Sequence, residues 1–391
     1  MTQRPASRGS LPTVAILFSQ FAAYHVDRVE AAARRLAGKA EVLAVEYATT
    51  SAAYAWEPAG GIENARHITL FPGRSYDDVG HMERFRAAMK AVRHADMVCI
   101  GVPYSERDII ALSWRLAAVG KKVVMMTESK FDDVPRHLAR EMAKARILSP
   151  YRAAIVGGLR QRDYLRFLGF GTKPVLPGYD TVGLDRIRMQ GAGQAVEWRN
   201  RPFLFVGRFV AKKNLATLLD AYARYRELAE GPPRDLIMAG DGELAETLKS
   251  RAGEGVQFPG FLRAEEVSQQ MAGALALCLV STEEQWGLVV NEAAAFGVPS
   301  IVSHAVGARD ALVRNGVAGH VVEPQSVEAI ASAMLDLAES EPTWQRHSKA
   351  VSALAHRGDT ERFADAVECL FDPASEAAAR CESFWDEISR S

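Results

Sequence analysis

The sequence contains only four cysteines among its 391 residues, and none of them stands in a pattern used for chemistry. Cys99, Cys278, Cys369 and Cys381 form no C-x-x-C pair, and no group of histidines, cysteines and aspartates has the spacing of metal ligands. Cys99 and Cys278 lie in apolar runs, where a thiol behaves as a small hydrophobe. We therefore expect no disulfide and no metal, and a reducing compartment fits such a chain.

Long apolar runs are also missing. No stretch of about 18 residues is apolar throughout, and we expect no signal peptide. We therefore expect a cytoplasmic protein.

The net charge is only −1, but the charges are unevenly placed. Residues 1–195 carry 28 Lys and Arg against 19 Asp and Glu, so the first part is basic and the remainder acidic. Much of the excess lies in two helical stretches, with Arg84, Arg86, Lys90 and Arg93 in one and Arg136, Arg140, Lys144, Arg146 and Arg152 in the other. Such faces are either simply solvated, or they contact an anionic membrane leaflet or a lipid-diphosphate acceptor. We do not expect nucleic-acid binding, because no basic–aromatic platform accompanies the charge.

The glycine-rich phosphate loop of dinucleotide-binding enzymes is absent. Residues 17–23, at and just after the end of the expected strand Val14–Phe18, contain no glycine. The sequence Gly191-Ala192-Gly193 follows no expected strand. An NAD-dependent oxidoreductase is therefore set aside.

Short apolar strands alternate with helical stretches along the chain. In the first half the expected strands are Val14–Phe18, Val42–Val45, Met97–Gly101, Val123–Thr127 and Ala153–Val156. This alternation predicts an α/β protein with parallel sheets covered on both faces. At this length we expect two Rossmann-like domains, residues 1–185 and 200–360, with the polar stretch 180–200 between them. Ligands then bind at the carboxyl ends of the strands.

Residues 281–299 carry the most informative pattern. Glu284 follows an apolar run, and Glu292 lies eight residues later inside an Ala-rich helix that ends at Gly297 and Pro299. If this helix begins near Gly287, its free N–H groups and positive dipole end face the loop that carries Glu284. A helix end of this kind suits a phosphate, and carboxylates suit sugar hydroxyls. A nucleotide-sugar has both kinds of group.

A second candidate site follows the apolar strand Pro202–Val206. The loop Gly207 to Asn214 carries Arg208 and Lys213, and an amphipathic helix comes next. Arg208 can make forked bonds to phosphate oxygens, while Lys213 acts as a compact charge. Further along, the strand Leu236–Ala239 ends in Gly240-Asp241-Gly242, where glycine permits a tight turn and a close approach to a ligand, and where we expect Asp241 to cap the next helix.

Together these patterns resemble the retaining glycosyltransferases of the GT-B fold, family 4, also called glycosyl transferases group 1. The resemblance covers about Arg201 to Pro324 and includes, in order, GR-x4-K, GDG, E-x7-E and the glycine loop at Gly307. It implies two Rossmann-like domains that face each other across a central cleft. It also implies that a C-terminal helix, about residues 361–391, packs back on the first domain.

The resemblance assigns roles to individual residues. Arg208 and Lys213 stabilise the leaving diphosphate, Glu284 binds donor-sugar hydroxyls, and Glu292 binds the nucleotide ribose. The other implied donor-binding residues are Gly207, Gly242, Trp286, Gly287, Leu288 and Gly307. The implied reaction moves a sugar from a UDP- or GDP-sugar to an acceptor hydroxyl of a glycan or lipid-linked acceptor. It retains configuration, needs no enzymic nucleophile, and uses no metal or other cofactor, because the two cations serve instead.

The acceptor side departs from the family pattern. The glycine pair that many relatives carry after the first strand is replaced by Phe21-Ala22-Ala23-Tyr24-His25, and Glu128 stands roughly where relatives carry a histidine. Tyr24, His25 and Glu128 are the candidate acceptor-side residues. Purely structural roles stay open for His25 and Glu128.

Two other functions remain compatible with the sequence. A nucleotide-sugar 2-epimerase of the same fold would convert the donor without an acceptor. A donor-binding, non-catalytic subunit would explain the missing glycine pair.

Overall fold

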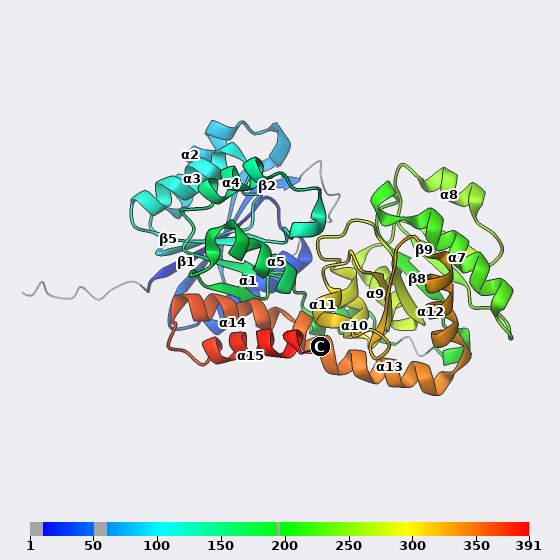
Figure 1. Ribbon diagram of the computed structural model, residues 1–391. Helices are drawn as coiled ribbons and strands as arrows, with labels where there is room; N and C mark the ends of the chain where they lie inside the picture. The colour runs from blue at the N-terminus through cyan, green and yellow to red at the C-terminus, as the bar shows by residue number, and fades with distance from the viewer. Residues whose placement is uncertain (1–10, 51–60, 194–195, 391) are drawn as a thin grey trace, which may run out of the picture.

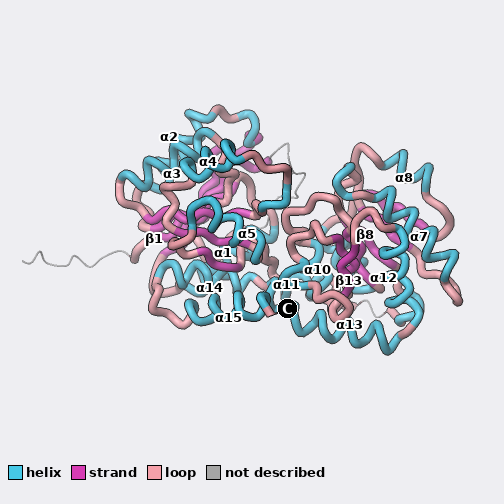
Figure 2. The backbone as a smooth tube through the Cα atoms, viewed as in Figure 1, coloured by secondary structure: helices cyan, strands magenta, loops and turns pink. Residues whose placement is uncertain are grey.

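The computed structural model describes residues 11–50, 61–193 and 196–390, and it contains two α/β domains side by side (Figure 1). Each domain has a parallel sheet at its centre with helices around it (Figure 2). The two parallel sheets confirm the predicted α/β architecture.

The first sheet has seven strands in the order β3-β2-β1-β4-β5-β6-β7, and all of its pairings are parallel. The strands are β1 Thr13–Phe18, β2 Glu41–Thr50, β3 Arg66–Ser75, β4 Met97–Ile100, β5 Lys122–Thr127, β6 Ala153–Val156 and β7 Val175–Pro177. The helices that follow them in this half are α1 Ala23–Arg35, α2 His81–Val92, α3 Arg107–Ala118, α4 Leu138–Ile147 and α5 Leu159–Leu165. One face of the sheet packs on α2, α3 and α5, and the other packs on α1.

The second sheet has six strands in the order β10-β9-β8-β11-β12-β13, again all parallel. The strands are β8 Phe203–Val206, β9 Leu236–Ala239, β10 Val256–Gly260, β11 Ala276–Leu279, β12 Ser300–Ser303 and β13 Gly319–Val322. The helices of this half are α6 Leu184–Gln190, α7 Leu215–Leu228, α8 Ala245–Arg251, α9 Ala264–Gly273, α10 Val289–Ala295, α11 Arg309–Leu312, α12 Val327–Glu339 and α13 Glu341–Leu354.

Four strands were not predicted from the sequence, namely β3, β7, β10 and β13. They are the four edge strands of the two sheets. A central strand of a parallel sheet is buried on both faces and therefore forms a continuous apolar run, whereas an edge strand tolerates polar residues, glycine and proline. β10 (Val-Gln-Phe-Pro-Gly) and β3, which contains Pro72 and Gly73, show this composition.

The end of the chain forms two helices, α14 Thr360–Phe371 and α15 Ala377–Ser389, where one helical stretch was expected. Helix α14 lies along α1, and α15 lies against α5 and β7, so both contact the first domain (Figure 1). Phe363 and Val367 of α14 are fully buried in the core beneath β1. None of the described helices is both long enough and apolar enough to span a bilayer.

A buried carboxylate ties α14 to α1. Asp365 is 1% exposed and binds Arg35 of α1, and it also accepts a hydrogen bond from Arg380 Nε of α15 at 2.7 Å. Arg35 also binds Glu361, and it lies 3.3 Å from Glu368. Removing one member of a buried ion-pair network leaves the remaining charges without compensation, which is costly.

We expect Asp365→Asn to lower the free energy of unfolding by about 3 kcal/mol, because it leaves three arginines, Arg35, Arg362 and Arg380, beside a neutral amide. Denaturant unfolding followed by circular dichroism measures this. Glu328→Gln, which removes the exposed ion pair with Arg224, is the control and should change stability by about 0.5 kcal/mol or less. Equal effects of the two substitutions would contradict the role given to Asp365.

Candidate active site

The sequence-predicted donor residues gather where four neighbouring strands of the second sheet end. Gly207 follows β8, Gly242 follows β9, Glu284 follows β11 and Gly307 follows β12. Because the strands are parallel, their carboxyl ends lie at one edge, and the loops that carry these residues meet there.

The glycines at this edge allow backbone to pack on backbone. Gly240 and Gly242 have φ values of +139° and +154°, and a Cβ on Gly240 would lie 1.9 Å from the carbonyl oxygen of Gly207. A Cβ on Gly242 would lie 2.6 Å from the carbonyl oxygen of Phe209. Neither position accepts a larger residue without moving the loop after β8.

The expectation that Asp241 caps a helix is wrong. Helix α8 begins at Ala245 with Leu244 at its N-cap, and the Asp241 carboxylate accepts a hydrogen bond from the neighbouring Gly242 N–H at 2.7 Å. The Asp241 carbonyl accepts the Phe209 N–H at 2.8 Å. Asp241 therefore shapes the turn that joins the two glycine loops.

The loops after β11 and β12 are also held together. Glu284 forms a parallel bridge with Val306, and the Trp286 carbonyl accepts the Ala308 N–H at 3.0 Å. A Cβ on Gly307 would lie 2.0 Å from the Gln285 carbonyl oxygen. Gly287, at φ +97°, turns the chain into α10.

The structure brings Lys213 and Glu284 into direct contact. The Lys213 ammonium binds Glu284 Oε2, and both side chains are largely buried, at 14% and 13% exposed. Ser281 Oγ donates a second hydrogen bond to the same oxygen at 3.1 Å. Asn214, at φ +57°, donates to the Val280 and Pro324 carbonyls and so fixes the lysine loop beside β11. Arg208 lies exposed on the same loop.

Glu292 lies in the first turn of α10, which begins at Val289 rather than at Gly287. Burial raises the pKa of Glu292 to about 7, and Arg186 of α6 opposes this shift. Arg186 itself pairs with Asp27 of α1 at 2.7 Å. Glu292 therefore lies beside the contact between α6 and the first domain.

Glu128, at the end of β5 in the first domain, faces the second domain. Burial raises the pKa of Glu128, the charge of Glu284 raises it further, and Arg28 and Lys212 oppose the shift. Glu284 and Lys212 belong to the second domain, so charges of that domain act on the Glu128 carboxyl. Glu128 therefore lies close enough to the donor loops for their charges to affect its pKa.

Asp180 was missed as a site residue because it was assigned to the polar stretch between the domains. It is 1% exposed, and neither carboxylate oxygen has a hydrogen-bond partner among the described residues. Burial raises the pKa of Asp180 well above its usual range, Glu128 adds to the shift, and Arg28 opposes it. Arg28 is also buried and donates to the Thr181 carbonyl at 2.9 Å. A buried carboxyl beside a second acid is typical of a functional site.

Tyr24 and His25 lie at the start of α1. His25 is buried with its ring centroid 4.2 Å from those of Phe18 and Tyr24, and its Nδ1 accepts the Ala22 N–H at 3.0 Å. Burial lowers the pKa of His25 well below its usual value, and Arg28 adds to this effect. Burial thus favours the neutral imidazole, which packs against Phe18 and Tyr24. Its acceptor-side role remains a prediction.

Trp286 is buried at the contact between the domains. Its indole ring lies against Gly157 and Gly158, and a Cβ on Gly157 would come within 2.6 Å of it. The indole N–H donates to Asn291 Oδ1 at 2.9 Å, and Asn291 Nδ2 donates to the Asp180 carbonyl at 2.9 Å. Trp286 therefore ties the donor loop to the first domain, and its backbone carries the link to the loop after β12.

The start of α5 holds the same loops from the first domain. Arg160 Nε donates to Asp310 at 2.8 Å, and its guanidinium also donates to the carbonyls of His304 and Val306. Gln161 Nε2 donates to the Gln285 carbonyl at 3.0 Å. Sequence motifs gave no indication of these residues, because their partners lie more than a hundred positions away.

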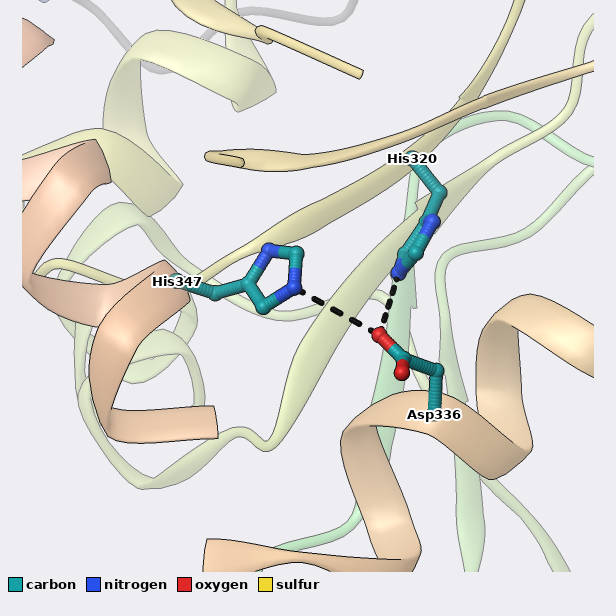
Figure 3. Close-up of side chains that lie close together, drawn as sticks. All are labelled: His320, Asp336 and His347. Carbon is teal, nitrogen blue, oxygen red and sulfur yellow. Dashed lines mark hydrogen bonds and ion pairs between the residues drawn. The ribbon is translucent and has the colours of Figure 1, made fainter. Parts of the chain in front are cut away.

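Two groups of side chains have the composition of a metal site that sequence spacing did not reveal. In the first, Asp336 of α12 lies 2.9 Å from His320 Nε2 of β13 and 3.4 Å from His347 Nε2 of α13 (Figure 3). However, His347 Nδ1 accepts the Gly319 N–H at 3.0 Å, so a neutral ring carries its proton on Nε2 and offers no lone pair to a metal there. The group fits a hydrogen-bonded link between β13, α12 and α13.

The second group is His81, Glu106 and Asp108. The Arg84 guanidinium lies 2.8 Å from Glu106 and 3.0 Å from Asp108, and it therefore supplies the positive charge between the two carboxylates. Neither group lies at the predicted donor site.

Comparison with known proteins matches residues 197–353 to the family Glycosyl transferases group 1. The chain is 30% identical over 173 residues to the glycogen synthase of Mycobacterium tuberculosis (strain ATCC 25618 / H37Rv). The aligned residues cover 43% of this chain and 41% of that protein. It is 24% identical over 246 residues to the phosphatidyl-myo-inositol mannosyltransferase of Mycobacterium leprae (strain TN). Here the aligned residues cover 60% of this chain and 64% of that protein. The matched region thus spans about two-fifths of the glycogen synthase.

Among solved structures, Anabaena HepE in complex with UDP and glucose superposes with a TM-score of 0.68 over 93% of this chain and all of that chain, at 14% identity. Together with the two parallel-sheet domains, this likeness shows the GT-B fold, which confirms the fold prediction. The resemblance to group 1 glycosyl transferases is confirmed for residues 197–353.

The raised pKa of Glu292 predicts a pH-dependent stability. The folded state holds the proton more tightly than the unfolded chain does, so stability falls as pH rises from the usual glutamate range to beyond about 7. We expect Glu292→Gln to remove this slope and to be the more stable protein at pH 8, by on the order of 2 kcal/mol. Unfolding measured between pH 5 and about 8 checks this.

Glu283→Gln, an exposed residue of the loop that precedes α10, serves as the control and should keep the wild-type slope. A Glu292→Gln protein whose stability follows the wild-type pH curve would refute the prediction.

Proposed function

We propose that this chain is a retaining glycosyltransferase, which moves a sugar from a UDP- or GDP-sugar to the hydroxyl of a glycan or lipid-linked acceptor. The observation that carries the proposal is the contact of Lys213 with Glu284 at the carboxyl edge of the second sheet. Arg208 lies on the same loop, and Glu128 faces them from the first domain.

The barrier of such a reaction lies in breaking the anomeric C–O bond while negative charge builds up on the leaving diphosphate. Arg208 and Lys213 stabilise that charge, and they need no reorganisation if their loop is already fixed. Asn214 and the glycine contacts of Gly207 provide this rigidity. The two cations take the place of a metal ion.

Glu284 and Lys213 work as a pair. A lysine ammonium has three donors, so it can bind a phosphate oxygen while it still contacts Glu284. Glu284, a carboxylate with further acceptor positions, binds hydroxyls of the donor sugar and sets the anomeric carbon beside the acceptor. Glu292 binds the ribose of the nucleotide.

The acceptor hydroxyl attacks on the face that the diphosphate leaves, and a phosphate oxygen takes its proton. Configuration is retained without a covalent enzyme intermediate. Glu128 lies on the acceptor side of the bond and orders the incoming hydroxyl. Burial and the neighbouring Glu128 charge raise the pKa of Asp180, so this site favours the neutral form of the Asp180 carboxyl.

The relatives support this proposal by what their names state. A glycogen synthase and a phosphatidyl-myo-inositol mannosyltransferase are transferases of sugars, and HepE was solved with UDP and glucose. These names leave the donor base, the sugar and the acceptor of this chain open.

We expect Lys213→Ala to slow the release of nucleoside diphosphate from the donor by a factor of roughly 10² to 10³, because one transition-state cation is lost. The measurement is release of UDP or GDP from a panel of donor sugars, with circular dichroism as a check of folding. Lys249→Ala, a substitution at an exposed lysine of α8, is the control and should turn over normally.

Near-normal turnover by Lys213→Ala would defeat the catalytic assignment. If the wild-type protein converted the donor into an epimer without any acceptor, the chain would be an epimerase instead.

A further inference from the structure

Helix α4 (Leu138–Ile147) in the first domain buries a charged side chain and exposes apolar ones. An ordinary surface helix packs its apolar stripe on the core and exposes its charges. In α4 the one buried residue is Glu141, while Leu138 and Met142, one turn apart, are 69% and 66% exposed. Ala139 and Ala143 are exposed as well.

The charges beneath the helix hold it in this orientation. Glu141 accepts a hydrogen bond from the Tyr164 hydroxyl at 2.5 Å and another from Lys144 at 3.0 Å. Arg136 stacks over the Tyr164 ring at 4.5 Å and lies 3.8 Å from Glu141. Turning the apolar residues inward would break these contacts, so the outward apolar face is part of the folded structure.

Neighbouring segments extend the apolar face. Phe131 and Val134, just before α4, are 51% and 52% exposed, and Phe167 is 56% exposed on the helical turn η3 Arg166–Phe170. The Phe131 and Phe167 rings meet edge to face with centroids 5.7 Å apart. We call Phe131, Val134, Leu138, Met142 and Phe167 the α4 patch.

Exposed arginines lie on the same segments as this patch. Arg140 and Arg146 are exposed on α4 itself, and within the described ranges neither side chain has an ion-pair partner. Arg166, 54% exposed beside Phe167, makes only a long contact of 3.8 Å with Asp163. Of the four Lys and Arg residues between positions 136 and 146, Arg136 and Lys144 contact Glu141, and Arg140 and Arg146 remain for an external partner.

We propose that the α4 patch docks on the surface of an anionic phospholipid bilayer. Its apolar side chains enter the boundary between headgroups and acyl chains, and Arg140, Arg146 and Arg166 bind headgroup phosphates. The apolar side chains come from three segments, a loop, a helix and a turn. A fluid bilayer accommodates such side chains without a matching shape, and long basic side chains on the same segments favour anionic lipid.

The proposal does not depend on the proposed sugar transfer, so its test measures binding alone. The full chain is sedimented at low salt with vesicles of phosphatidylcholine and with vesicles that also contain phosphatidylglycerol. We expect the protein to bind the anionic vesicles and to be released by added salt, because salt screens the attraction between the arginines and the anionic headgroups.

Two double variants separate the apolar contribution from the electrostatic one. Leu138→Gln with Met142→Gln keeps good helix formers at exposed positions and should weaken binding to anionic vesicles on the order of tenfold. Arg140→Gln with Arg146→Gln should reduce the preference for anionic over neutral vesicles. Met189→Gln, at a methionine 71% exposed on α6, is the matched control and should bind like wild type.

Three results would overturn the proposal. One is a wild-type protein that ignores anionic vesicles at low salt. Another is wild-type binding by the Leu138→Gln, Met142→Gln variant, since the apolar tips would then not enter the bilayer. The third is a dimer that this variant dissociates, measured by light scattering, because a second copy would then cover the patch.

Discussion

The contact of Trp286 with the first domain fixes the geometry on which the candidate site depends. The indole ring occupies space that exists only because residues 157 and 158 are glycines. Its N–H is linked through Asn291 to the backbone of Asp180, so the loop that carries Glu284 and the helix that carries Glu292 are positioned by one buried network. Arg160 and Gln161 add direct bonds to the same loops. Two sheets that share no strand are thereby brought to one site, with their carboxyl ends facing each other.

Charge balance is the second constraint at this junction. Carboxyl groups from both domains gather there, and burial raises the pKa of Glu128, Asp180 and Glu292. Lys213 and Arg28 offset part of the negative charge. A phosphate-bearing ligand would add more, and under the proposed function Arg208 and Lys213 on the loop after β8 would offset its charge. Carboxylates for sugar hydroxyls and cations for a diphosphate are both present, and a nucleotide-sugar requires both.

The sequence predicted those parts of the molecule whose signals are local. Central strands appear as apolar runs, and glycine loops followed by charged residues mark the strand ends, so the core and the donor loops could be located. Edge strands such as β3 and β10 could not, because exposure lets polar residues, glycine and proline into them. Asp180 and Arg28 were missed for a different reason. Their surroundings come from long-range contacts, since Arg28 donates to the Thr181 carbonyl and the Asp180 carbonyl accepts from Asn291, and no spacing along the chain records such contacts. The same applies to the His320, Asp336 and His347 group, in which the Gly319 N–H binds His347 Nδ1 and so favours the tautomer that donates to Asp336.

The central claim is that the carboxyl edge of the second sheet binds a nucleotide-diphospho-sugar. Isothermal titration calorimetry of UDP, GDP and their common sugar conjugates, on the wild-type protein and on Glu292→Ala, tests it most directly. The account predicts that one nucleotide binds selectively and that the substitution abolishes or strongly weakens this binding, since the ribose contact is lost. Absence of binding by every nucleotide, or unchanged binding by Glu292→Ala, would contradict the assignment of the site.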